Sequence, residues 1–416
     1  MKFNPFEEKP VDVKSTIQSW GELYPKQYQY NKNEVDPYTK TRIILMNGTE
    51  FESNWFSHQF SRHCDNNDLR REIAELRRIE KQQQMKISNL RPLDETILET
   101  TISYEQLAVD LTAALAKSEK DKNVKAALDF ALLEDFDHLY RYADLLEMDQ
   151  GVRAENLVGK YTEIMPGRPT IAHHRCPHDS MRKFADFNKA DLKTKLNINI
   201  ITAAEQQTMN YYMNVSSLYK NDIGRQLYLE IGMVEEQHVS QYASLKDPRC
   251  TWLEELLMHE YTEAYLYYSC YMTETDENIK KIWEQCLTQE IAHLHKAADL
   301  LKKYEKKEWQ EVIPNADFPQ ILELKSNKDY VRDILKTVNL TADKEGYIDV
   351  SKLGKDSGFY KYQQKVNKNV DDVVSHTVIE KYIDENGEDY RYQEKPHPIS
   401  ELDDKKKDNT TVGRIK

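Results

Sequence analysis

Two short strings in the sequence could each bind a metal ion. In Glu235–His238 and in Glu290–His293 a glutamate is followed three residues later by a histidine, inside a stretch with apolar residues at helical spacing. Residues three apart share one face of a helix, so the carboxylate and the imidazole can reach the same ion. A single string of this kind is also common as a solvated surface pair. The case for a metal therefore depends on what accompanies the strings.

A third candidate ligand, an acidic residue, stands thirty positions before the glutamate of each string. Glu205 precedes Glu235 by this interval, and Glu260 precedes Glu290 by the same interval. This spacing of Glu, Glu and His, here called the register, recurs one hundred residues before Glu205, Glu235 and His238, with an aspartate in place of one glutamate. The members of this further copy are Glu105, Asp135 and His138. Glu134 or Asp137 is the alternative to Asp135 if the phase of the helix differs.

Each copy of the register spans two expected helices joined by a polar turn. The stretches 103–149, 196–246 and 251–306 have apolar residues at helical spacing, and each is interrupted midway between its candidate ligands. About fifteen residues on each arm, at 1.5 Å per residue, place both ligands about 22 Å from the turn. The ligands of one hairpin should therefore face each other at one height.

Two such hairpins would supply four carboxylates and two imidazoles to the inside of a four-helix bundle. This is a set that binds two iron or manganese ions. It leaves open positions at the metals for dioxygen or peroxide. The sequence thus predicts an all-α protein with a buried pair of metal ions.

These residues resemble the signature of the ferritin-like dimetal-carboxylate superfamily, a Glu on one helix and Glu-x-x-His on the next, given twice. The resemblance covers residues 103–306, and stretches such as TAAEQQTMNYYMNVSSLY and EIAHLHKAADLL are similar to rubrerythrin-type helices. It implies that Glu235 and Glu290 bridge the metals, that Glu205 and its counterparts are terminal ligands, and that the histidines complete the coordination. The cysteine pairs of a rubredoxin domain do not follow, which puts the usual electron route in doubt.

Two pairings of the hairpins remain open. Ferritin-like folds join their hairpins by a long crossover, and the segment 150–195 is long enough, which pairs the first hairpin with the second. The third hairpin, however, carries the complete glutamate set. In the alternative it packs with the second hairpin in up-down order, with Glu263 as an additional carboxylate one turn after Glu260. Both pairings retain Glu205, Glu235 and His238.

The rest of the chain suggests three parts. Residues 1–100 are expected to be an irregular segment with one polar helix near 66–88, and residues 101–306 a ferritin-like domain of three hairpins. Residues 307–416 are expected to be a polar tail, with a β-hairpin over Val378–Tyr392 because alternating residues flank Asn386-Gly387.

Composition narrows the class of partners. The 71 acidic residues outnumber the 58 basic ones, which disfavours nucleic-acid binding. No apolar run approaches the length that spans a bilayer, and the first residues lack the apolar core of a signal peptide. The five cysteines are scattered and form no paired motif, so they are expected to be reduced thiols. A cytoplasmic protein without membrane contact is expected.

The leading expectation for function is an oxidoreductase, peroxidase-like or catalase-like, that acts on dioxygen or hydrogen peroxide with two iron or manganese ions. The electron donor is not identified, and assembly into a homo-oligomer is left open. The alternative is a non-enzymatic metal-binding, storage or scaffold protein with the same bundle. A third hypothesis is that the protein is a relative of manganese catalase.

Overall fold

The computed structural model describes residues 3–24, 26–168, 173–368 and 373–391. The all-α fold is confirmed, since the regular elements of the described residues are helices apart from one two-stranded antiparallel sheet, β1 Leu340–Asp343 with β2 Gly346–Asp349. The chain divides into two compact units, each built from separated segments. Unit 1 comprises residues 1–95, 185–207 and 246–323, and unit 2 comprises residues 96–184, 208–245 and 324–416.

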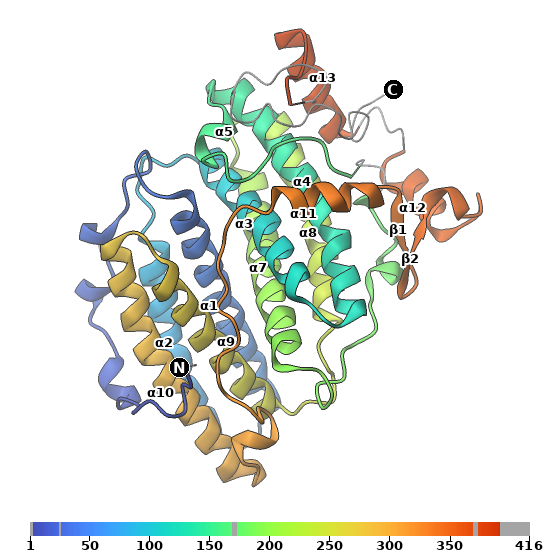
Figure 1. Ribbon diagram of the computed structural model, residues 1–416. Coiled ribbons are helices and arrows are strands. Elements are labelled where there is room, and N and C mark those ends of the chain that lie inside the picture. The colour runs from blue at the N-terminus through green and yellow to red at the C-terminus, as the bar shows by residue number, and fades with distance from the viewer. Residues whose placement is uncertain (1–2, 25, 169–172, 369–372, 392–416) are drawn as a thin grey trace. The chain divides into compact units, whose positions relative to one another are not determined.

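Unit 1 contains two helical hairpins that lie side by side (Figure 1). The first hairpin is made of α1 Pro37–His63 and α2 Asn67–Ser88, and the second of α9 Trp252–Thr273 and α10 Glu277–Glu305. Contacts of α1 with α9 and of α2 with α10 join the two hairpins into a four-helix arrangement. Short 3-10 helices flank them: Val13–Thr16, Trp20–Leu23, Lys26–Tyr28 and Trp309–Glu311.

Unit 2 is built around α3 Ile97–Ser118, α4 Lys122–Gln150 and α8 Asp222–Ala243, together with the second half of α7. Helix α7 runs without a break over Leu192–Leu218 and passes from unit 1 into unit 2 after residue 207. Smaller elements complete the unit: α5 Ala154–Leu157, α11 Lys328–Ile334, α12 Gly358–Val366, α13 Val374–Asn386, and 3-10 helices at Pro177–Ser180, Leu335–Thr337 and Val350–Lys352.

Local sequence explains where the long helices begin and end. The side chains of Thr96 and Thr251 each accept a hydrogen bond from the backbone N–H three residues on, and the glutamate side chain at that position accepts one from the threonine N–H. Asp121 and Asp276 cap the second helix of their hairpins in a similar way. The polar turns predicted within the three hairpins lie between α3 and α4, between α7 and α8, and between α9 and α10.

The first hairpin of unit 1 differs from the expectation of an irregular N-terminal segment. Residues 37–63 form α1, a helix of 27 residues. Its buried face includes Thr41, Thr49, Ser53 and Asn54, so polar side chains take the places that an apolar stripe would normally mark. The helical period was therefore not visible in the hydrophobic pattern. The predicted helix near 66–88 is present as α2.

The C-terminal part also differs from expectation, because the predicted β-hairpin is a helix. Val374–Asn386 forms α13, and Gly387, with φ +79°, is the left-handed residue that ends it. The Asn-Gly pair therefore marks a helix end rather than a hairpin turn; Tyr392 lies outside the described residues. Helix α13 packs on α4 and α8, so this region belongs to unit 2 and is not a loose tail.

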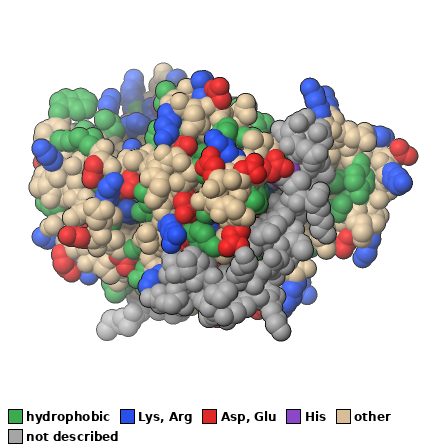
Figure 2. Space-filling model, turned by 90° about the horizontal axis from the view of Figure 1, so that it is seen from above, with side chains coloured by type: hydrophobic (Ala, Val, Ile, Leu, Met, Phe, Trp, Pro, Cys, Tyr) green, Lys and Arg blue, Asp and Glu red, His purple; other side chains and the backbone are tan. Residues whose placement is uncertain are grey.

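Two features of the surface complete the fold. Acidic and basic side chains are interspersed on the face shown in Figure 2. Among the described residues, no helix combines the length and apolar character needed to cross a lipid bilayer.

Candidate metal centres

In unit 1, ligand atoms from three helices converge on one buried point. Glu80 of α2, Glu260 of α9, and Glu290 and His293 of α10 each offer one atom, and these four atoms lie within 4.8 Å of one another. All four side chains are at most 2% exposed. Glu290 and His293 share a face of α10, with His293 Nδ1 3.3 Å from a Glu290 oxygen. The group could therefore hold a metal ion.

Polar neighbours hold the carboxylates of this cluster in place. Gln83 Nε2 donates to Glu290 Oε1 at 2.6 Å, and Ser53 Oγ donates to Glu80 Oε2 at 2.7 Å. The hydroxyl of Tyr267 donates to Glu50, a further buried glutamate on α1. Such outer hydrogen bonds orient ligands and are typical of metal sites.

The acidic charge of the unit 1 cluster is poorly compensated by protein groups. Burial, followed by the repulsion of neighbouring carboxylates, raises the pKa of Glu50, Glu260 and Glu263 well above its ordinary value. The pKa of His293 is raised because the attraction of Glu290 and Glu80 exceeds the opposing effect of burial. Both oxygens of Glu263 and Nε2 of His293 lack a hydrogen-bond partner among the described residues. Buried groups of this kind are costly unless a cation joins them, so the donor set fits metal ions.

In unit 2, Glu235 of α8 lies between two histidines. One of its oxygens is 2.9 Å from His138 Nδ1, and the other is 3.1 Å from His238 Nδ1. Asp135 of α4 is 3.2 Å from the same atom of His238. Glu105 of α3 belongs to the His138 side of the group. The five side chains are at most 1% exposed, and they offer three carboxylates and two imidazoles at one level of the unit.

Glu134 takes a different position from its neighbour Asp135. Glu134 Oε2 is 2.6 Å from His238 Nε2, and Arg175 Nη1 lies 2.7 Å from both Glu134 oxygens. Although burial opposes ionisation, Arg175 and His238 hold the pKa of Glu134 well below its ordinary value. An ionised Glu134 accepts a hydrogen bond from His238 Nε2, while Nδ1 of the same ring faces Asp135 and Glu235. Glu134 is thus placed to orient a ligand rather than to be one.

Asp137, the other alternative to Asp135, is engaged elsewhere. Its carboxylate accepts hydrogen bonds from Arg141 Nε at 2.8 Å and from the Gly167 N–H at 3.0 Å. Of the three acidic residues in this part of α4, Asp135 is therefore the one that joins Glu235 and His238.

Glu205 lies on α7, in the part of this helix that belongs to unit 1, and is 1% exposed. Tyr212, seven residues further along the same helix, belongs to unit 2, where its hydroxyl donates to Glu105. Residues seven apart lie on the same face of a helix. Glu205 and Tyr212 therefore occupy one face of α7.

The hairpins pair as in the first of the two arrangements considered from sequence. Glu235 and His238 of α8 contact Asp135 and His138 of α4. Glu260, Glu290 and His293 of the last hairpin are instead grouped with Glu80 of α2, and Glu263 faces the same carboxylates. The last hairpin thus belongs to a bundle of its own rather than extending the first.

Three residues of the unit 1 cluster were not identified from the sequence: Glu50, Glu80 and Gln83. A signal was present, because Glu80 follows Glu50 by thirty residues and Glu50 precedes Glu105 by fifty-five, the interval that separates Glu205 from Glu260. Gln83 stands where the other three copies have histidine, and this substitution hid a fourth copy of the register. The polar face of α1 hid its helix as well.

Comparison of the chain with protein-family models, with curated proteins and with solved structures gives no significant match.

Proposed function

We propose that this protein is a dimetal-carboxylate oxidoreductase of the ferritin-like kind, with a centre in each unit, that acts on dioxygen or hydrogen peroxide. The observation that carries the proposal is the set of buried carboxylate and imidazole atoms within 4.8 Å of one another, repeated in both units. Their low exposure matters most. Acidic clusters at a surface are common without ions, whereas buried ones are costly without them.

The proposed ligands of the unit 1 centre come from both hairpins of that unit. They are Glu50, Glu80, Glu260, Glu263, Glu290 and His293, with Gln83 as a supporting donor. The proposed ligands of the unit 2 centre are Glu105, Asp135, His138, Glu235 and His238. Glu205 is proposed as a further carboxylate there, because it shares the α7 face of Tyr212, which is bonded to Glu105.

Bound iron or manganese would supply the electrons that reduce the oxidant. The chain's own contribution is to exclude water and to fix the donors. The outer bonds from Ser53 to Glu80 and from Gln83 to Glu290 keep these carboxylates from rotating. In unit 2, Arg175 neutralises Glu134 and thereby keeps the His238 ring in one orientation.

The two centres differ in charge and in ligand type. Unit 1 offers five carboxylates and one imidazole, and the described residues place no Lys or Arg in hydrogen-bond contact with these carboxylates. Unit 2 offers two imidazoles. Arg175 contacts Glu134, which in turn contacts His238. Oxygen ligands favour harder ions such as manganese, and imidazole suits iron. The unit 1 centre is therefore expected to retain manganese better than the unit 2 centre does.

Metal counting tests the proposal directly. The full chain, freed of metal and titrated anaerobically with Fe²⁺ or Mn²⁺, is expected to bind about two ions per centre. The double variant Glu290→Gln/His293→Ala should lose the ions of unit 1 and keep those of unit 2. Glu235→Gln/His238→Ala should do the reverse. The matched control is Glu284→Gln, an exposed glutamate on the same helix as Glu290, which should change nothing.

Less than about one ion per chain after reconstitution would contradict the proposal. Metal binding without consumption of dioxygen or peroxide would favour the non-enzymatic alternative instead. Oxygen release from peroxide without a reductant would indicate a catalase-like reaction.

A further inference from the structure

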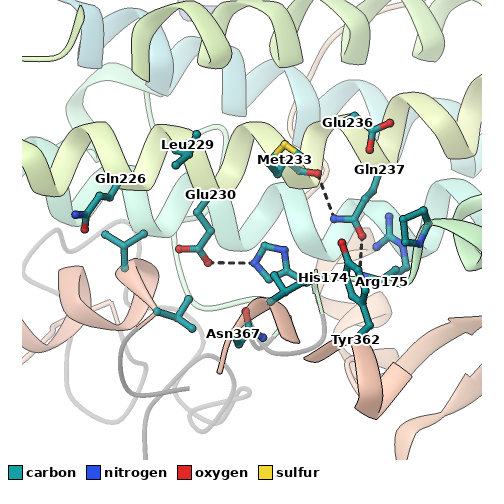
Figure 3. Close-up of a pocket in the computed structure, with 14 residues that line it drawn as sticks. His174, Arg175, Gln226, Leu229, Glu230, Met233, Glu236, Gln237, Tyr362 and Asn367 are labelled. Carbon is teal, nitrogen blue, oxygen red and sulfur yellow. Dashed lines mark hydrogen bonds and ion pairs between the residues drawn. The ribbon is translucent and has the colours of Figure 1, made fainter. Parts of the chain in front are cut away.

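A cavity of about 560 Å³ lies beside α8 in unit 2 (Figure 3). One wall is a single face of α8, marked by Leu229, Met233 and Gln237 at a spacing of four residues. The other walls are the segment His174–Pro177, the end of α12 and the beginning of α13. Its volume is within the range of sites for small organic molecules.

The cavity gathers apolar side chains that are unusually exposed. Leu229 is 61% exposed, Met233 48% and Val366 43%, and all three line the cavity together with Val373 and Val374. Single exposed apolar residues are ordinary, but several around one concave site indicate a surface that binds something apolar. A ligand with an apolar body would cover these exposed apolar side chains.

Two charged groups of the cavity, Glu230 and Arg175, are already matched by charged protein partners, and a third, Glu236, accepts a hydrogen bond from Ser240 Oγ at 2.8 Å. Glu230 lies 3.5 Å from His174 Nε2 and accepts the Ser375 N–H at 3.1 Å, and the dashed line in Figure 3 marks its pair with His174. The guanidinium of Arg175 is held by Glu134, and Gln237 accepts the Arg175 N–H at 2.6 Å. No charge in these pairs requires a counter-ion from the ligand.

We propose that this cavity binds an uncharged small organic molecule with an apolar body and one hydrogen-bonding group. Met233, Leu229 and Val366 cover the body, and the hydroxyl of Tyr362 or the amide of Gln226 meets the polar group. A carboxylate or sulfonate on the ligand is disfavoured because Glu230 and Glu236 also line the cavity.

The cavity adjoins the groups that orient the unit 2 centre. Gln237 holds the backbone of Arg175, Arg175 clamps Glu134, and Glu134 contacts His238. A bound molecule thus touches the outermost member of this chain. The link between the cavity and a metal centre rests on the proposed function, whereas binding of a molecule in the cavity itself requires no metal.

The test uses the metal-free full chain and the neutral fluorescent probe N-phenyl-1-naphthylamine. Saturable binding with a Kd on the order of 100 µM is expected for a ligand of this size. Met233→Lys should weaken binding by about tenfold or more, because it places an ammonium group in the apolar wall. The matched control is Met213→Lys, since Met213 is 42% exposed on α7 in the same unit and does not line the cavity.

The proposal is overturned if no saturable binding occurs below about 1 mM, or if Met213→Lys weakens it as much as Met233→Lys does. The sulfonated analogue 8-anilinonaphthalene-1-sulfonate should bind more weakly than the neutral probe. Equal affinity would overturn the assignment to uncharged ligands. Failure of metal binding in the earlier titration leaves each of these results unaffected, so the two proposals are tested separately.

Discussion

The side chains that support ligands differ between the two centres. In unit 2 a carboxylate, Glu134, accepts a hydrogen bond from Nε2 of the candidate ligand His238 and is itself paired with Arg175. In unit 1 the supporting group is an uncharged amide, Gln83, which donates to Glu290. An amide can fix a carboxylate but cannot balance its charge. A metal centre in unit 1 would therefore depend more on its ions for charge balance than one in unit 2.

Gln83→Ala should weaken metal binding in unit 1 by about 10- to 100-fold, because the Glu290 carboxylate loses the bond that orients it. Affinity can be measured by competition with a chelator in the Glu235→Gln/His238→Ala background, in which only unit 1 is expected to bind. Gln84→Ala is the matched control, since Gln84 bonds to Asn47 and not to the cluster. Equal losses in the two variants would contradict the role given to Gln83.

At the scale of elements, the crossover from α4 to α7 packs directly against a helix backbone. The Arg168 N–H donates to the carbonyl of Leu133 at 3.1 Å, beside the bond from Gly167 to Asp137. A Cβ on Gly167 would collide with the Leu133 carbonyl and come within 2.9 Å of the Asp137 nitrogen. Only glycine allows this approach.

Gly167→Ala should therefore destabilise unit 2 by about 1–3 kcal/mol, because the crossover must move away from α4. Urea denaturation followed by circular dichroism measures the loss. Gly354→Ala, at a position with nothing within 4 Å of the new carbon, should stay within about 0.5 kcal/mol of the natural protein. A neutral result for Gly167→Ala would mean that the crossover is free to shift.

Sequence spacing was sufficient to predict three of the four long hairpins and their turns, and the convergence of Asp135, His138, Glu235 and His238 follows from one of the two hairpin pairings that it left open. It failed where the buried face is polar. In α1, residues such as Thr49 and Ser53 are buried through hydrogen bonds to other parts of unit 1 or to their own helix, which a hydrophobic pattern cannot reveal. The Asn386-Gly387 pair failed for another reason, because glycine in the left-handed region ends helices as readily as it forms hairpin turns.

At the scale of the whole molecule, each centre should stabilise its own unit. A ligand present at about a thousand times its Kd adds about 4 kcal/mol to the free energy of unfolding of the part that binds it. Removal of metal with a chelator should therefore speed amide hydrogen exchange in α2, α9 and α10 and in α4 and α8. His293→Ala should abolish the effect of metal in the first group alone, and His238→Ala in the second group alone. Loss in both groups from either variant would contradict independent centres.

The nesting of the hairpins has a consequence for how the protein is made. The hairpin of α1 and α2 packs on α9 and α10, which follow the whole of α3 to α8 in the chain. At the usual pace of ribosomes, on the order of ten seconds pass before those partners emerge. During that time the hairpin that carries Glu50 and Glu80 lacks its contacts with α9 and α10, so the hairpins α3–α4 and α7–α8 can pack together before the first and last hairpins meet.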